Sequence, residues 1–214
     1  MDTGSTGILM TASKVPGYSP SSCIYGSEYL SSSKKLYEGC WVNDNITLAS
    51  IAVAEVPILA ARSLCTCTNL SSQTGQCAGP KFNCKQDPPR IQCIGVGFGR
   101  DSPAQPPGLP DKNPLLNIIS VNDVPVKPGT MHTGYIITAT GIQLGLTSSN
   151  TTAFAMTQLT QGSYYCKDKR GWAGVSICIS IDGAPCVSGR ALFDTGITES
   201  YLRTNVILHN ITYC

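Results

Sequence analysis

The chain has 214 residues, of which 42% are hydrophobic and 13% are charged, and its formal net charge is +2. The charged share is about half of the ~25% that soluble proteins usually carry, and so small a net charge provides no long-range field to steer a polyanion. A nucleic-acid partner and a disordered chain are therefore not expected, and the length allows one large domain or two lobes that each bury a core.

Short segments of strand character follow one another along the chain, separated by Gly, Pro, Ser and Asn. The best helical window, residues 50–63, contains Pro57 and four β-branched residues, which favour a strand. The other expected strands are 37–48, 91–95, 116–121, 134–144, 175–181 and 191–193. This pattern predicts an all-β chain.

Two segments have the composition of connections. Residues 100–114 contain five prolines and almost no apolar periodicity, so we expect a loop between two lobes. The predicted division places an N-terminal lobe at 1–113 and a C-terminal lobe at 114–214. Residues 71–90 are rich in Gly, Pro and Gln and predict a second loop, tied by Cys77 and Cys84.

Eleven cysteines indicate an oxidising compartment, and five of them fall within 65–93. Zinc sites use ligand pairs about two to four residues apart, a spacing that these cysteines do not repeat, so we expect disulfides and no metal. The sequence leaves the connectivity open. An odd count means that one thiol is free or that its partner lies outside this chain, with Cys23 and Cys214 as the candidates.

Four Asn-X-Ser/Thr sequons support passage through a secretory pathway, and their acceptors are Asn45, Asn69, Asn150 and Asn210. No apolar run approaches the ~18 residues of a membrane span, so no transmembrane segment is expected in this chain. We expect a secreted, extracellular or vacuolar protein whose signal segment is not part of this sequence.

Two Asp-Thr-Gly triplets lie near opposite ends of the chain, at Asp2 and at Asp194. The second follows the apolar segment Ala191-Leu192-Phe193, an arrangement in which a strand ends in a tight turn that holds the carboxylate. One such triplet is an ordinary turn sequence. Two of them, one in each predicted lobe, are harder to explain as ordinary turns.

The sequence resembles the pepsin-like aspartic proteases. Besides the triplets, the segments Cys93–Gly99 (CIGVGFG) and Tyr135–Gly145 (YIITATGIQLG) resemble the glycine-rich strand of the first lobe and the strand pair of the second lobe in that family. The resemblance implies a bilobal, all-β fold that is incomplete at both termini of this chain. It also implies a monomer that cleaves peptides or proteins without a cofactor.

The resemblance further assigns roles to the residues of both triplets. Asp2 and Asp194 share one proton and activate a water molecule for attack on the peptide carbonyl. Thr3 and Thr195 bond across to the opposite loop and hold the two aspartates in register, while Gly4 and Gly196 let the backbone turn tightly. A hairpin flap is expected to carry a tyrosine, Tyr29, with Tyr37 as the reserve.

The residue after each triplet differs between the two copies. Ser5 supplies the hydroxyl that the family uses to support its aspartate, whereas Ile197 cannot. Asp194 is therefore expected to have the higher affinity for the shared proton. This difference keeps a catalytically inactive pepsin-fold binding protein as an alternative. A cysteine-rich extracellular structural module with two unrelated Asp-Thr-Gly turns is a further one.

Overall fold

A computed structural model describes residues 1–30, 32–71, 76–97, 110–160 and 173–198. Within these residues most of the regular structure is β-strand, and the one α-helix is a single turn, α1 (Ser148–Thr151). Three short 3-10 turns complete the inventory, at Ala12–Lys14, Pro20–Ser22 and Pro110–Lys112. The prediction of an all-β chain is confirmed.

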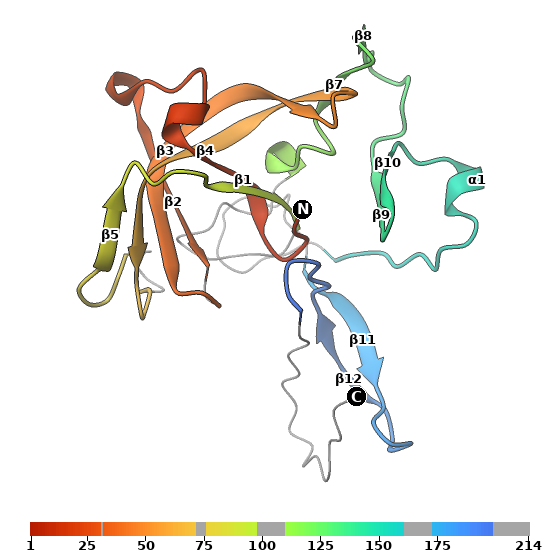
Figure 1. The fold of residues 1–214 in the computed structure, drawn as a ribbon. Helices are drawn as coiled ribbons and strands as arrows, with labels where there is room; N and C mark the ends of the chain where they lie inside the picture. The colour runs from red at the N-terminus through yellow and green to blue at the C-terminus, as the bar shows by residue number, and fades with distance from the viewer. Residues whose placement is uncertain (31, 72–75, 98–109, 161–172, 199–214) are drawn as a thin grey trace.

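Eight of the strands form one sheet (Figure 1). Its central path runs β2-β3-β4-β1-β6, with β5, β7 and β8 attached beside it. In chain order these strands are β1 (Thr6–Thr11), β2 (Ile24–Leu30), β3 (Lys35–Leu48), β4 (Ala52–Thr66), β5 (Phe82–Gln86), β6 (Gln92–Val96), β7 (Ile118–Val121) and β8 (Val124–Pro125).

The long strand β4 organises this sheet. One of its edges pairs with β3 from Leu48↔Ala52 to Lys35↔Thr66, and its other edge pairs in succession with β7, β1 and β5. Pro57 falls in the gap on that second edge, between the residues that pair with β7 and those that pair with β1. A proline is tolerated in a strand where it removes no ladder hydrogen bond, so this gap accommodates Pro57 inside the strand.

The core lies on both faces of β1 and β4. Ile8 and Ile58 belong to one buried cluster, while their sequence neighbours Leu9 and Leu59 belong to another. Successive side chains of a strand point to opposite faces, so a strand buried on both faces needs a continuous apolar run. The run Ile58–Ala61 satisfies this requirement, because each of its residues is at most 1% exposed.

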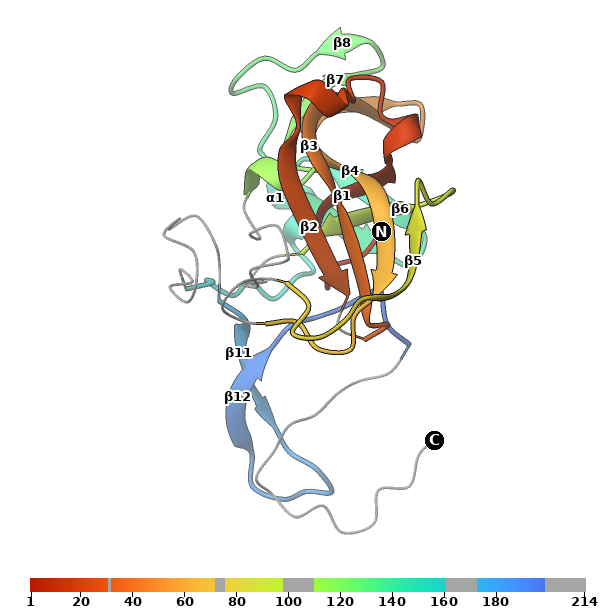
Figure 2. The ribbon, with the colours of Figure 1, turned by 90° about the vertical axis from the view of Figure 1, so that its left-hand side faces the viewer.

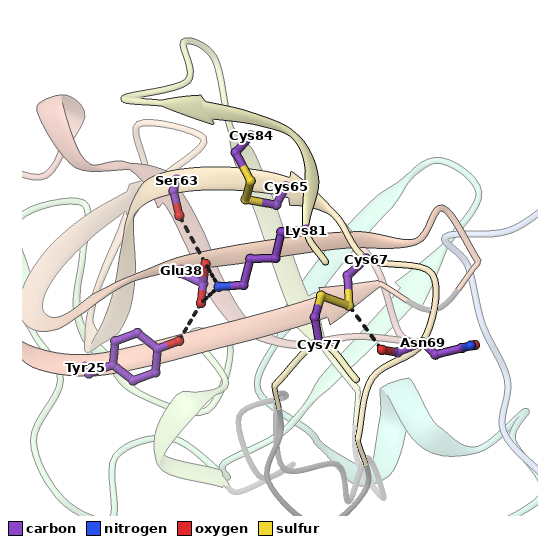
Figure 3. Close-up of polar contacts among 9 residues, drawn as sticks. All are labelled: Tyr25, Glu38, Ser63, Cys65, Cys67, Asn69, Cys77, Lys81 and Cys84. Atoms are coloured by element: carbon purple, nitrogen blue, oxygen red, sulfur yellow. Dashed lines mark hydrogen bonds and ion pairs between the residues drawn. A yellow bond between two sulfur atoms is a disulfide. The ribbon is translucent and has the colours of Figure 1, made fainter. Parts of the chain in front are cut away.

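The hairpin of β2 and β3 is fastened to the segment that follows β4, and Figure 3 shows one of the contacts, between Glu38 and Lys81. Tyr29 is buried, and its hydroxyl donates to the Cys67 carbonyl oxygen at 3.0 Å. The Cys67 amide donates to the Lys34 carbonyl oxygen at 2.9 Å. On the same hairpin Glu38 forms an ion pair with Lys81, whose Nζ lies 2.6 Å from Oε1. The hairpin expected near Tyr29 is therefore present, with the Tyr29 ring packed inward.

Four disulfides join cysteines of the described residues, and they correct two expectations. The bonds join Cys23 to Cys40, Cys65 to Cys84, Cys67 to Cys77, and Cys178 to Cys186. The expected loop at 71–90 contains a strand: Cys84 lies within β5 and bonds to Cys65 of β4, while Cys77 bonds to Cys67, the residue after β4. The expectation that Cys23 lacks a partner is also wrong, because Cys23 bonds to Cys40.

Among the described cysteines the free thiol belongs to Cys93. Cys166 and Cys214 lie outside the described residues.

The second half of the chain contributes two separate hairpins: β9 (Tyr135–Thr138) with β10 (Gly141–Leu144), and β11 (Val175–Ile179) with β12 (Val187–Ala191). The β11–β12 hairpin projects away from the eight-stranded sheet in both views (Figures 1 and 2). The predicted lobe boundary falls just before β7, and β7 and β8 pair into the first sheet. The division into lobes at 113/114 stays a prediction.

No helix in the described part of the chain is long and apolar enough to cross a membrane. Of the sequon acceptors, Asn45 and Asn69 are exposed. Asn150 is half-buried, and its Nδ2 donates to the Gly145 carbonyl oxygen at 3.1 Å. Asn210 lies outside the described residues, and glycosylation at all four stays a prediction.

Tyr29→Phe tests the fastening of the β2–β3 hairpin. The substitution leaves the buried Cys67 carbonyl without this donor, so we expect unfolding free energy to fall by about 1–2 kcal/mol. Tyr18→Phe is the control, because the Tyr18 hydroxyl has no hydrogen-bond partner among the described residues. We expect that control to change stability by less than about 0.5 kcal/mol in chemical denaturation. Equal losses in both variants would contradict this account.

Candidate active site

The first Asp-Thr-Gly turn wraps around strand β6. Gly95 of β6 bridges to Asp2 on one side and pairs with Gly7 of β1 on the other. The Asp2 amide donates to Ile94 O at 2.9 Å, and Asp2 O accepts from the Val96 amide at 2.9 Å. The backbone at Asp2 is therefore fixed by the sheet, although Asp2 precedes the first strand.

Glycines make this close approach possible. A Cβ at Gly95 would lie 2.5 Å from Thr6 N and 2.6 Å from Ser5 C, and one at Gly97 would lie 2.8 Å from Ser5 O. Real Cβ atoms essentially never come so close to backbone atoms. The glycine-rich strand noted in the sequence is thus a packing requirement of the Met1–Ser5 loop.

Both aspartates are oriented by their own turns. The Gly4 amide donates to Asp2 Oδ1 at 2.6 Å, and the Gly196 amide donates to Asp194 Oδ1 at 2.7 Å. The two turns also face each other closely. A Cβ at Gly4 would overlap the Asp194 carboxyl group, and one at Gly196 would lie 2.6 Å from Asp2 Cγ.

A reciprocal pair of hydrogen bonds joins the turns. The Thr3 amide donates to Thr195 Oγ1 at 3.1 Å, and the Thr195 amide donates to Thr3 Oγ1 at 2.9 Å. Each hydroxyl also donates to a backbone carbonyl of the opposite turn, Thr3 to Phe193 O at 2.7 Å and Thr195 to Met1 O at 3.3 Å. Residues at the two ends of the described chain are thereby held in one site.

The carboxyl of Asp2 interacts with that of Asp194 and with donors of its own turn. Burial raises the pKa of Asp2, but hydrogen bonds from the Ser5 hydroxyl, the Gly4 amide, Asp194 and the Ser5 amide together lower it below its ordinary value. Ser5 is buried with 2% exposure, and its Oγ lies 3.6 Å from Cys93 Sγ. In the second turn, Ile197 occupies the matching position and is 38% exposed.

Sequence reasoning missed one acidic residue beside this site. Glu28 on β2 is 2% exposed, and burial followed by the charge of Asp2 raises the pKa of Glu28 to about 8. Its neighbour Tyr29, the predicted flap tyrosine, is buried with its hydroxyl on Cys67 O, so its ring does not lie open to a ligand. In the sequence, Glu28 is only an acid beside the strand residue Tyr29, and that pattern by itself does not indicate a functional site.

No cluster of three or more potential metal ligands is found in the described residues. Comparisons with family models, curated proteins and solved structures return no match for this chain. The site must therefore be interpreted from its own geometry.

Gly95→Ala tests the packing of the first turn. Its Cβ would meet backbone atoms that cannot rotate away, so we expect a loss of about 3 kcal/mol in unfolding free energy. Gly189→Ala on β12 is the matched control, because nothing lies within 4 Å of its Cβ position. We expect that variant to lose no more than about 0.5 kcal/mol. A Gly95→Ala protein as stable as the control would contradict the wrapped-loop geometry.

Proposed function

We propose that this chain is a pepsin-like aspartic endopeptidase, in which Asp2 and Asp194 hydrolyse peptide bonds through an activated water molecule. The observation that carries the proposal is the reciprocal Thr3–Thr195 link, which holds the two carboxyl groups against each other. The alternative of two unrelated Asp-Thr-Gly turns does not predict this contact.

The asymmetry of the pair suggests which aspartate holds the shared proton. Two carboxyl groups in contact cannot readily both ionise, because each negative charge opposes the other. Asp2 is surrounded by donors that favour its ionised form, whereas the second turn has Ile197 in place of a hydroxyl. In this proposal Asp2 is the ionised member and Asp194 is the protonated one.

The chemistry follows from that assignment. Asp2 accepts a proton from the attacking water, and Asp194 donates its proton to the oxygen of the scissile carbonyl. Water is the nucleophile, so no acyl-enzyme forms. The neighbouring amides of Gly4 and Gly196 stay bonded to the carboxylates and keep them oriented while the proton moves.

The wider setting belongs to the same proposal. The chain would adopt a bilobal fold divided at 113/114, with strands β1 to β6 in the first lobe and the β9–β10 and β11–β12 hairpins in the second. The substrate would be an extended peptide or a protein segment, and the enzyme would act as a monomer. The four disulfides of the described residues are compatible with a secreted or vacuolar location.

Asp2→Asn and Asp194→Asn test the proposal. Each substitution removes one of the two groups that exchange the proton, so we expect peptidase activity at acidic pH to fall at least ~10³-fold. The control is Asp123→Asn in the β7–β8 turn, where φ is +61° and Asn is readily accepted. Cleavage of an unstructured protein, with and without pepstatin, provides the readout. Activity that survives both active-site substitutions would exclude this mechanism.

A second candidate function, peptide binding without hydrolysis, is favoured by Ile197. Ile197→Thr supplies the missing donor and stabilises the ionised form of Asp194, so the shared proton leaves more readily. If the wild-type protein is an enzyme, we expect the alkaline limb of its pH profile to move down by about one unit. If only Ile197→Thr cleaves, the wild-type protein is the binding form.

A further inference from the structure

Glu28 occupies an unusual position for a carboxyl group. It lies on β2 directly opposite Tyr37 of β3, and its side chain is 2% exposed. Among the described residues it is the one ionisable side chain other than tyrosine or cysteine in the buried core. Burying a carboxylate without a partner is costly, so an acid in such a place is kept neutral.

The described residues offer Glu28 neither a hydrogen-bond donor nor a cation. Glu38, on the adjacent strand, shows the contrast. Its carboxylate binds Lys81 and accepts from the hydroxyls of Tyr25 and Ser63, and these contacts, against the opposing effect of burial, lower the pKa of Glu38. The pKa values of the two glutamates of this hairpin are therefore shifted in opposite directions.

The groups that face Glu28 are themselves acids. Tyr37 of β3 is the cross-strand partner of Glu28 and packs in one hydrophobic cluster with Cys93 of β6, whose Sγ lies 3.6 Å from Ser5 Oγ in the Asp2 loop. Burial and then the charge of Asp2 raise the pKa of Glu28, and burial followed by the charge of Glu28 raises the pKa of Tyr37 and of Cys93. Any second negative charge in this cluster therefore meets like charges in a buried setting.

We propose that Glu28 is a third carboxyl group of the candidate site, a positioning residue that must stay protonated for the Asp2 loop and the β2–β3 hairpin to remain packed together. Its effect on peptidase activity rests on the proposed function. Its effect on the fold around Asp2 does not.

The direction of the pH dependence follows from the pKa of Glu28, which is about 8 in the folded chain against an ordinary value of 4.5. A folded-state pKa above the unfolded value means that the folded chain binds the proton more tightly. The stability linked to this proton is complete below about pH 4.5 and is lost as pH rises through about 8. Above that range Glu28 and Asp2 would both be charged, and the packing between their elements would open.

The coupling is reciprocal. If the charge of Asp2 raises the pKa of Glu28, then removing that charge in Asp2→Asn must lower it toward the ordinary value. The pH-dependent loss should then become smaller. The pKa of a buried acid that has no electrostatic interaction with Asp2 would not change in Asp2→Asn.

The test compares the full chain with Glu28→Gln, Glu55→Gln and Asp2→Asn from pH 4.5 to 9. Glu55 is the matched control, because it is an exposed glutamate on β4. We expect the wild-type and Glu55→Gln melting temperatures to fall over this range. We expect Glu28→Gln to abolish at least half of that fall and Asp2→Asn to reduce it. The same fall in Glu28→Gln as in the wild-type protein would overturn the proposal.

A second measurement needs no substitution at Glu28. The infrared carbonyl band of a protonated carboxylic acid should persist at pH 7, disappear with a midpoint near pH 8, and be retained in Asp194→Asn. Complete ionisation of all carboxyl groups by pH 7 would overturn the proposal, whether or not Glu28→Gln folds.

The activity assay separates this proposal from the proposed function. After incubation at pH 9 and return to acid, we expect Glu28→Gln to keep at least twice the peptidase activity of the wild-type protein. Equal losses would overturn the role of Glu28 alone. No peptidase activity in any form would remove the proposed function, while the melting and infrared measurements would still test Glu28.

Discussion

The absence of a side chain at Gly95 is the constraint on which the site depends. One residue of β6 is paired on both of its edges, by the bridge to Asp2 and by β1, and a Cβ there would meet the backbone of Ser5 and Thr6. Because of this approach, the sheet fixes the backbone of a loop that lies outside its strands. The aspartate at the start of that loop is thereby held in a defined place.

The sequence was sufficient where the signal is local. Pro57 and the β-branched residues identified β4 as a strand, and the predicted segment 37–48 lies within β3. The two triplets could also be recognised, because tight turns have a fixed chemistry. The disulfide pairs could not be assigned. Cys65 bonds to Cys84 and Cys67 bonds to Cys77, and the sequence spacing does not distinguish this pairing from the reverse one. Glu28 was missed because its burial beside Asp2 depends on the pairing of β2 with β3.

The two halves of the candidate site are supported unequally. Asp2 is held by Ser5 and by β6, which pairs with β1, a strand buried on both faces. Asp194 follows the β11–β12 hairpin, whose strand residues are half-buried or exposed. The first half therefore determines the geometry, and the second half is positioned against it through Thr3 and Thr195.

The link between the halves is polar and largely exposed, and this has a consequence for how the molecule opens. Separating Thr3 from Thr195 exposes little apolar surface, so it should contribute little to the heat capacity of unfolding. Separation of the two aspartates is then a local event whose free energy is set by a few hydrogen bonds rather than by the core. Amide exchange at Thr195 would report that opening while the amides of β4 stay protected.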